Sequence, residues 1–96
     1  MKAAVIYGRK DVRIEEVAEP KVSKGKVKIK VAWAGICGSD LHAYHHGLGV
    51  AYEEHPISKR KVPLILGHEF AGVVTEVGEG VTNVSVGDKV AVEPNL

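Results

Sequence analysis

The stretch KVKIKVAWAGICGSDLHAYHH, residues 26–46, joins two kinds of local pattern. Residues 26–31 alternate between lysine and a β-branched apolar residue, which predicts a strand whose apolar side chains face a core while the lysines face water. Residues 39–46 predict a short helix, with Ser39 or Asp40 as its N-cap. The chain is therefore expected to pass from a strand into a helix through a glycine-containing turn.

The rest of the chain also has the pattern of short strands. Each candidate segment is apolar or alternating and is bounded by a turn signal; the segments are 3–7, 12–17, 73–77 and 89–92. Turns are expected at 23–25, 78–80 and 86–88, and residues 47–62, which have no clear period, are expected to form a long loop. Many short strands with turns between them indicate a mainly β fold, a small barrel or sandwich.

Composition limits the classes of function. The 96 residues suit one small domain, and a net charge of +1 gives no electrostatic reason to expect nucleic acid or a membrane as partner. The apolar start of the chain is too short for a signal peptide, and no stretch approaches the length of a transmembrane helix. The single cysteine cannot form an internal disulfide, so we expect a cytoplasmic protein.

Reactive side chains occur at two breaks in the strand pattern. Cys37 lies between two nearby glycines, which let the backbone turn and present the sulfur. His68 and Glu69 interrupt the apolar run LILGHEFAG, where an imidazole and a carboxylate are costly to bury without a partner. Thiolate, imidazole and carboxylate are the usual zinc ligands. Because Cys37 and His68 are 31 positions apart (68 − 37), the fold would have to assemble this site, as in catalytic zinc centres.

Each candidate ligand also has a simpler structural interpretation. A single cysteine is commonly a small buried hydrophobic residue, and a histidine in an apolar stretch is commonly a hydrogen-bonded core residue. Glu69 could pair with a nearby cation, Ser39 could serve only as a cap, and His42 could be a partly exposed helical residue. Among the other aromatic and imidazole residues, Trp33 and Phe70 are predicted in the core, and His45, His46 and His55 at the surface.

Two motifs resemble the N-terminal signatures of zinc-dependent, medium-chain alcohol dehydrogenases: GICGSDLH at 35–42 and GHEFAG at 67–72. The opening MKAAVIYG and the segment VTEVGEGVTNVSVGDKVAVEPN at 74–95 are similar to the same family, in the same order. The resemblance implies a GroES-like β-barrel with one short helix, the N-terminal portion of a dehydrogenase catalytic domain. Within the family, HPISKRKVPLILGHEF at 55–70 is most similar to 2,3-butanediol dehydrogenases, with sorbitol dehydrogenases nearby.

The resemblance implies a role for each motif residue. Cys37 and His68 match the catalytic zinc ligands, and Glu69 matches a carboxylate that either binds zinc or supports a ligand. Ser39 matches the hydroxyl that contacts the substrate oxygen, and His42 matches a residue that relays the proton to solvent. The implied reaction transfers hydride between a small-molecule alcohol, a secondary alcohol or vicinal diol, and NAD, with Zn²⁺ acting on the alcohol oxygen and the corresponding ketone as product.

The sequence departs from the family in what it does not contain. GEGVTN at 78–83 and GLGVAY at 47–52 begin as G-x-G but have no third glycine, and neither is placed between a strand and a helix. No cofactor-binding residue is therefore expected. The resemblance then implies that residues 1–96 are a fragment that lacks the nucleotide-binding Rossmann domain and the structural-zinc lobe. Such a fragment should be inactive alone, bind zinc weakly through an incomplete ligand set, and form a homo-oligomer through exposed strand edges.

Other interpretations remain open. A sorbitol, polyol or threonine dehydrogenase of the same family would share these motifs. A zinc-free quinone reductase of the same fold typically lacks the ligands, so Cys37 together with His68 argues against it. A non-enzymatic GroES-like barrel would give no reason for a thiol, a hydroxyl and a His-Glu pair at these positions, and metal content would separate it from a dehydrogenase.

Overall fold

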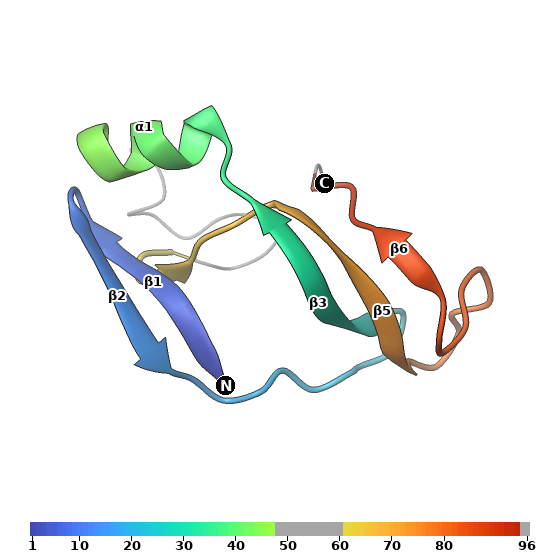
Figure 1. Cartoon of the computed structure of the whole chain (residues 1–96). Helices are drawn as coiled ribbons and strands as arrows, with labels where there is room; N and C mark the ends of the chain where they lie inside the picture. The colour runs from blue at the N-terminus through green and yellow to red at the C-terminus, as the bar shows by residue number, and fades with distance from the viewer. Residues whose placement is uncertain (48–60, 95–96) are drawn as a thin grey trace. The chain divides into compact units, whose positions relative to one another are not determined.

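Among the residues whose structure is described, the strands form two antiparallel sheets of three strands each (Figure 1). The computed structural model describes residues 1–47 and 61–94. The chain divides into two units, of which the first comprises Met1–Ala18 and Ile36–Gly67 and the second Glu19–Gly35 and His68–Leu96. Each unit contains one of the two sheets. The predicted class, mainly β with one short helix, is confirmed.

The first unit is built on a hairpin of β1 (Lys2–Gly8) and β2 (Asp11–Glu16). The short strand β4 (Leu64–Ile65), which the sequence analysis did not predict, pairs with the other edge of β1 and gives the order β2-β1-β4. Because β1 is the central strand, it carries the buried residues of this sheet, Val5 and Ile6, which are 6% and 0% exposed. Helix α1 (Gly38–His46) completes the unit.

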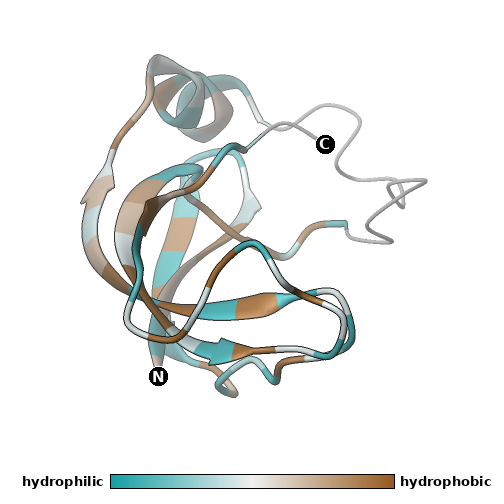
Figure 2. Cartoon of the chain, turned by 90° about the vertical axis from the view of Figure 1, so that its right-hand side faces the viewer, coloured by the Kyte–Doolittle hydropathy of each residue, from teal (hydrophilic) through white to brown (hydrophobic). Residues whose placement is uncertain are grey.

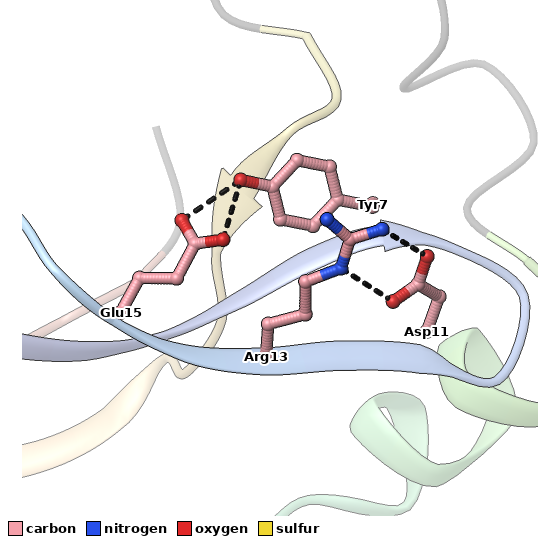
Figure 3. A network of polar contacts seen from close by, with 4 residues as sticks. All are labelled: Tyr7, Asp11, Arg13 and Glu15. Carbon is pink, nitrogen blue, oxygen red and sulfur yellow. Dashed lines mark hydrogen bonds and ion pairs between the residues drawn. The ribbon is translucent and has the colours of Figure 1, made fainter.

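Four side chains form a polar network on the β1–β2 hairpin (Figure 3). The Tyr7 hydroxyl donates to the Glu15 carboxylate at 2.7 Å, and this hydrogen bond raises the pKa of Tyr7. The Arg13 guanidinium lies 4.1 Å from the centre of the Tyr7 ring and donates two hydrogen bonds of 3.0 Å to Asp11. The bond from Arg13 lowers the pKa of the Asp11 carboxyl. The Arg13–Asp11 pair is solvent-exposed and therefore reinforces the hairpin only modestly.

The second unit contains β3 (Val27–Gly35), β5 (Glu69–Val77) and β6 (Lys89–Ala91), in the order β3-β5-β6. Polar and apolar residues are interspersed along the strands (Figure 2). Val74 of β5 is only 1% exposed, and Gly72 on the same strand is also buried. Each predicted strand is therefore present, although β3 and β5 run further than the alternation indicated: β3 ends two residues before Cys37, and β5 begins at Glu69.

The predicted alternation of β3 is only partly right. The pairing with β5 shifts register between Lys28 and Ile29 and again between Val31 and Trp33. Each shift places an extra residue in one strand and changes which side chains share a face. Val31 and Trp33, both predicted in the core, are instead 52% and 81% exposed. Lys28, predicted to face water, has a half-buried side chain that pairs with Glu19 at 2.8 Å.

The predicted turns are confirmed by backbone geometry. Gly25, Gly80 and Gly87 have φ values of +76°, +84° and +95°, a region that favours glycine. Most of the predicted loop over 47–62 lies outside the described residues. Phe70, predicted in the core, is half-buried. Within the part of the chain that the structure describes, no helix is long and apolar enough to cross a membrane.

Candidate metal centre

The end of the β3–β5 ladder brings the two sequence motifs together. In the last pair of this ladder, Gly35 lies opposite Glu69. Cys37 follows Gly35 by two residues, and His68 immediately precedes Glu69. Because consecutive Cα atoms are only about 3.8 Å apart, this antiparallel register is enough to place the thiol and the His-Glu pair at the same end of the sheet.

Cys37 is held at the start of α1 as its N-cap residue, in an extended conformation with φ −86° and ψ 156°. Its backbone N–H donates to the Asp40 carboxylate at 3.0 Å, and the Asp40 N–H donates back to the Cys37 carbonyl at 3.0 Å. The prediction of Ser39 or Asp40 as the cap is therefore wrong. The helix begins earlier, which leaves Asp40 as the third helical residue, where a carboxylate can reach back to the N-cap N–H.

Glycine has a different role here from the one predicted. Neither Gly35 nor Gly38 has a positive φ, so neither is needed for a tight turn. Gly35 instead provides space, because a Cβ at this position would lie 3.1 Å from Oε2 of Glu69. The backbone position that does require glycine is Gly67, with φ +113°, directly before His68. Gly67 thus lets the chain turn into β5.

The three candidate ligands form one group. Their ligand atoms, the Cys37 Sγ, an imidazole nitrogen of His68 and a carboxylate oxygen of Glu69, all lie within 4.8 Å of one another. Ligand atoms of one tetrahedral zinc ion are roughly 3–4 Å apart, so side-chain rotations that move these atoms by about 1 Å would bring them into place. Cys37 and His68 are half-buried and Glu69 is exposed.

The donor set fits zinc chemically. A thiolate, a neutral imidazole and a carboxylate together carry the two negative charges that balance Zn²⁺, and three protein ligands leave the fourth position open, as in catalytic zinc sites. Among the described residues, no Lys or Arg side chain forms an ion pair with Glu69. The simpler interpretation of Glu69, as the partner of a cation, therefore has no support within residues 1–47 and 61–94.

The two predicted proton-transfer residues lie on the helix that Cys37 caps. Ser39 is in the first turn of α1, and His42 follows it by three positions, so the two side chains emerge on neighbouring parts of the helix surface. Both residues are exposed. His45 and His46 are exposed as predicted, whereas His55 lies outside the described residues.

Asp40 has a role at the site that was not predicted: its carboxylate accepts the hydrogen bond from the Cys37 backbone N–H. Asp40 was considered only as a cap, although a carboxylate three residues after Cys37 is the spacing of a capping box. That signal was obscured because the N-cap position holds cysteine instead of the usual serine or threonine.

Comparison with known proteins identifies the relatives. Residues 23–95 match the Alcohol dehydrogenase GroES-like domain. An (R,R)-butanediol dehydrogenase of Bacillus subtilis (strain 168) is 55% identical over 98% of this chain and 28% of the relative, and one of Neisseria gonorrhoeae is 50% identical over 100% and 28%. A sorbitol dehydrogenase of Bacillus subtilis (strain 168) is 44% identical over 100% of this chain and 26% of the relative. The chain thus spans about a quarter of the length of the curated relatives it matches.

Solved structures agree with these relatives. The 2R,3R-butanediol dehydrogenase of Bacillus subtilis matches with a TM-score of 0.91 and 54% identity, over 96% of this chain and 27% of that chain. An Escherichia coli alcohol dehydrogenase complexed with NADH has a TM-score of 0.76 and 41% identity, over 98% and 24%. A zinc-dependent alcohol dehydrogenase from Streptococcus pneumonia has a TM-score of 0.75 and 33% identity, over 96% of this chain and 24% of that chain. The resemblance to zinc-dependent alcohol dehydrogenases is confirmed, and the chain belongs to the alcohol dehydrogenase GroES-like domain family.

Proposed function

We propose that residues 1–96 are the N-terminal, zinc-binding domain of a longer NAD-dependent dehydrogenase that oxidises a secondary alcohol or a vicinal diol such as 2,3-butanediol. The observation that carries this proposal is the grouping of Cys37, His68 and Glu69 at the end of the β3–β5 ladder. Identity of 50–55% to two butanediol dehydrogenases supports the diol as substrate. The nicotinamide cofactor would bind to a Rossmann domain outside these residues.

The residues of the site would divide the work between holding the metal and moving a proton. Cys37, His68 and Glu69 would hold zinc through sulfur, nitrogen and oxygen. Zinc, when bound, supplies a Lewis acid that lowers the pKa of a bound alcohol. The Ser39 Oγ would accept the hydroxyl proton of the substrate while its own proton passes to the His42 imidazole. His42 is exposed, so it can release that proton to water.

The proposal extends to cell location and assembly. We place the enzyme in the cytoplasm. We also expect a homo-oligomer, because four strands of the described sheets, β2, β3, β4 and β6, are each paired along one edge only. A sorbitol or polyol dehydrogenase is the second candidate, supported by 44% identity to the sorbitol dehydrogenase of Bacillus subtilis. A zinc-free reductase and a non-enzymatic barrel are both disfavoured by the zinc-type donor set.

Metal titration of the chain tests the metal centre. We expect Co²⁺, used as a coloured substitute for zinc, to give a thiolate charge-transfer band that is lost in Cys37→Ser and weakened in His68→Ala and Glu69→Gln. His45→Ala, which changes an exposed histidine outside the group, is the matched control. A band that survives His68→Ala and Glu69→Gln unchanged would show that these residues are not ligands.

A chimera tests the catalytic role and the substrate. This chain would replace the matching segment of the Bacillus subtilis butanediol dehydrogenase, since 98% of this chain aligns with 28% of that enzyme. We expect NAD-dependent oxidation of (R,R)-2,3-butanediol, faster than that of sorbitol, and a loss of at least about 100-fold in kcat for Cys37→Ser, since the metal ligand is removed. Faster oxidation of sorbitol would favour the second candidate, and a folded but inactive chimera would refute both. The isolated chain should show no turnover.

A further inference from the structure

Two histidines outside the candidate metal centre have neighbouring rings on α1. His42 and His46 are four positions apart, which places them about 40° apart around the helix axis, on consecutive turns. The centres of their rings are 4.7 Å apart, with the ring planes inclined by 36°. Both residues are exposed. The neighbouring His45 has its ring centre 6.4 Å from that of His46 and makes a T-shaped contact with Tyr44 at 5.2 Å.

This spacing suits two imidazoles that share one metal ion. Zinc–nitrogen bonds are about 2.0–2.1 Å long, so two rings bound to the same ion have centres roughly 5 Å apart. The observed 4.7 Å is already close to that value. Imidazole is a ligand that Zn²⁺, Ni²⁺ and Cu²⁺ all accept, and solvent around exposed rings can complete the coordination shell.

The helix fixes the spacing of the two histidines along the backbone. Its start is fixed by the hydrogen bond from Cys37 to Asp40, and its end by the bond from the Gly47 N–H to the Ala43 carbonyl at 2.9 Å. Ala43 is 5% exposed, so the helix has a buried side in addition to the side that presents the histidines. A site that is held in place before the ion arrives loses less entropy on binding than two independent side chains.

We propose that His42 and His46 form a two-histidine binding site for a divalent transition-metal ion, separate in its ligands from the Cys37–His68–Glu69 group. An ion bound at this site is coordinated by the His42 imidazole, which then cannot carry a proton on the coordinating nitrogen. If His42 relays protons as proposed above, excess metal therefore inhibits the enzyme. That consequence rests on the proposed function, whereas binding at the site does not.

Calorimetric titration with Ni²⁺ tests the site in a chain that carries Cys37→Ser, which removes the competing thiol. We expect one ion to bind, and affinity to fall at least about tenfold in both His42→Ala and His46→Ala, because either change converts a chelate into a single ligand. Alanine favours helix, so neither change should unfold α1, and circular dichroism checks this. His45→Ala is the matched control and should bind Ni²⁺ like its parent.

Broadening of histidine ring signals by Cu²⁺ in NMR spectra gives an independent readout. We expect the rings of His42 and His46 to broaden together at substoichiometric Cu²⁺, before that of His45. Equal loss of Ni²⁺ affinity in all three alanine variants, or a loss in only one of His42→Ala and His46→Ala, would overturn the proposal. Either result would leave the Co²⁺ test of Cys37 unaffected, so failure of this site and failure of the metal centre are distinguishable.

Discussion

Gly72→Ala probes a close approach between β3 and β5. Gly72 pairs with Val31 on one side and with Val90 on the other. A Cβ at this position would lie 2.1 Å from the carbonyl oxygen of Lys30 and 2.9 Å from its carbonyl carbon. Both are backbone atoms, so no side-chain rotation relieves the clash. Since carbon–oxygen contacts need roughly 3.3 Å, the two strands must move apart by about 1 Å.

The cost of that movement has two parts. Forcing an extra methyl group into a packed position costs about 1–3 kcal/mol. A shift of 1 Å also weakens about two ladder hydrogen bonds beside the bulge at Val31, each worth about 0.5–1.5 kcal/mol. We therefore expect Gly72→Ala to lower the free energy of unfolding by about 2–6 kcal/mol, a large share of the stability of a small domain.

The same change to alanine at two further glycines provides controls for Gly72→Ala. Gly38→Ala meets no atom within 4 Å and lies in the first turn of α1, so it should raise stability by up to about 1 kcal/mol. Gly25→Ala also has space, but its φ of +76° should cost about 1–2 kcal/mol. Urea unfolding followed by far-ultraviolet circular dichroism, in metal-free buffer, gives the three values. A Gly72→Ala variant within 0.5 kcal/mol (about the experimental error) of its parent would refute the reasoning.

Three other outcomes follow from burial and charge. Ile6→Ala should lower the free energy of unfolding by about 2–5 kcal/mol, whereas Ile14→Ala, at a site 71% exposed, should cost far less in the same urea assay. Trp33, 81% exposed, should emit like tryptophan in water and be quenched freely by acrylamide; a blue-shifted, protected emission would contradict the structure. Because Arg13 lowers the pKa of Asp11, the stabilisation by this carboxylate is present above its ordinary pKa of about 4 and is lost as pH falls through the lowered value. Asp11→Asn should therefore flatten the acid limb of the stability–pH curve, and an unchanged limb would count against the pairing.

The sequence predicted the elements better than their limits. Period-two patterns and glycine turns identified the strands, because alternation and left-handed turns are local properties of the chain. The strand β4 was missed because two residues, Leu64–Ile65, carry no measurable period and are a strand only through pairing with β1. The core was mispredicted at Trp33 because the register shift that precedes it, between Val31 and Trp33, depends on the pairing with β5; Val31 lies before that shift, and its exposure has no explanation in the register.

The identity of the candidate ligands was likewise set by the sequence, through the chemistry of Cys37, His68 and Glu69 in otherwise apolar segments. Their proximity was not, because nothing local to either motif states that residues 31 positions apart share a site. The register that places Gly35 opposite Glu69 decides that, together with the space that Gly35 leaves for a carboxylate. Side-chain chemistry belongs to each residue alone, whereas a distance between motifs exists only after the strands have paired.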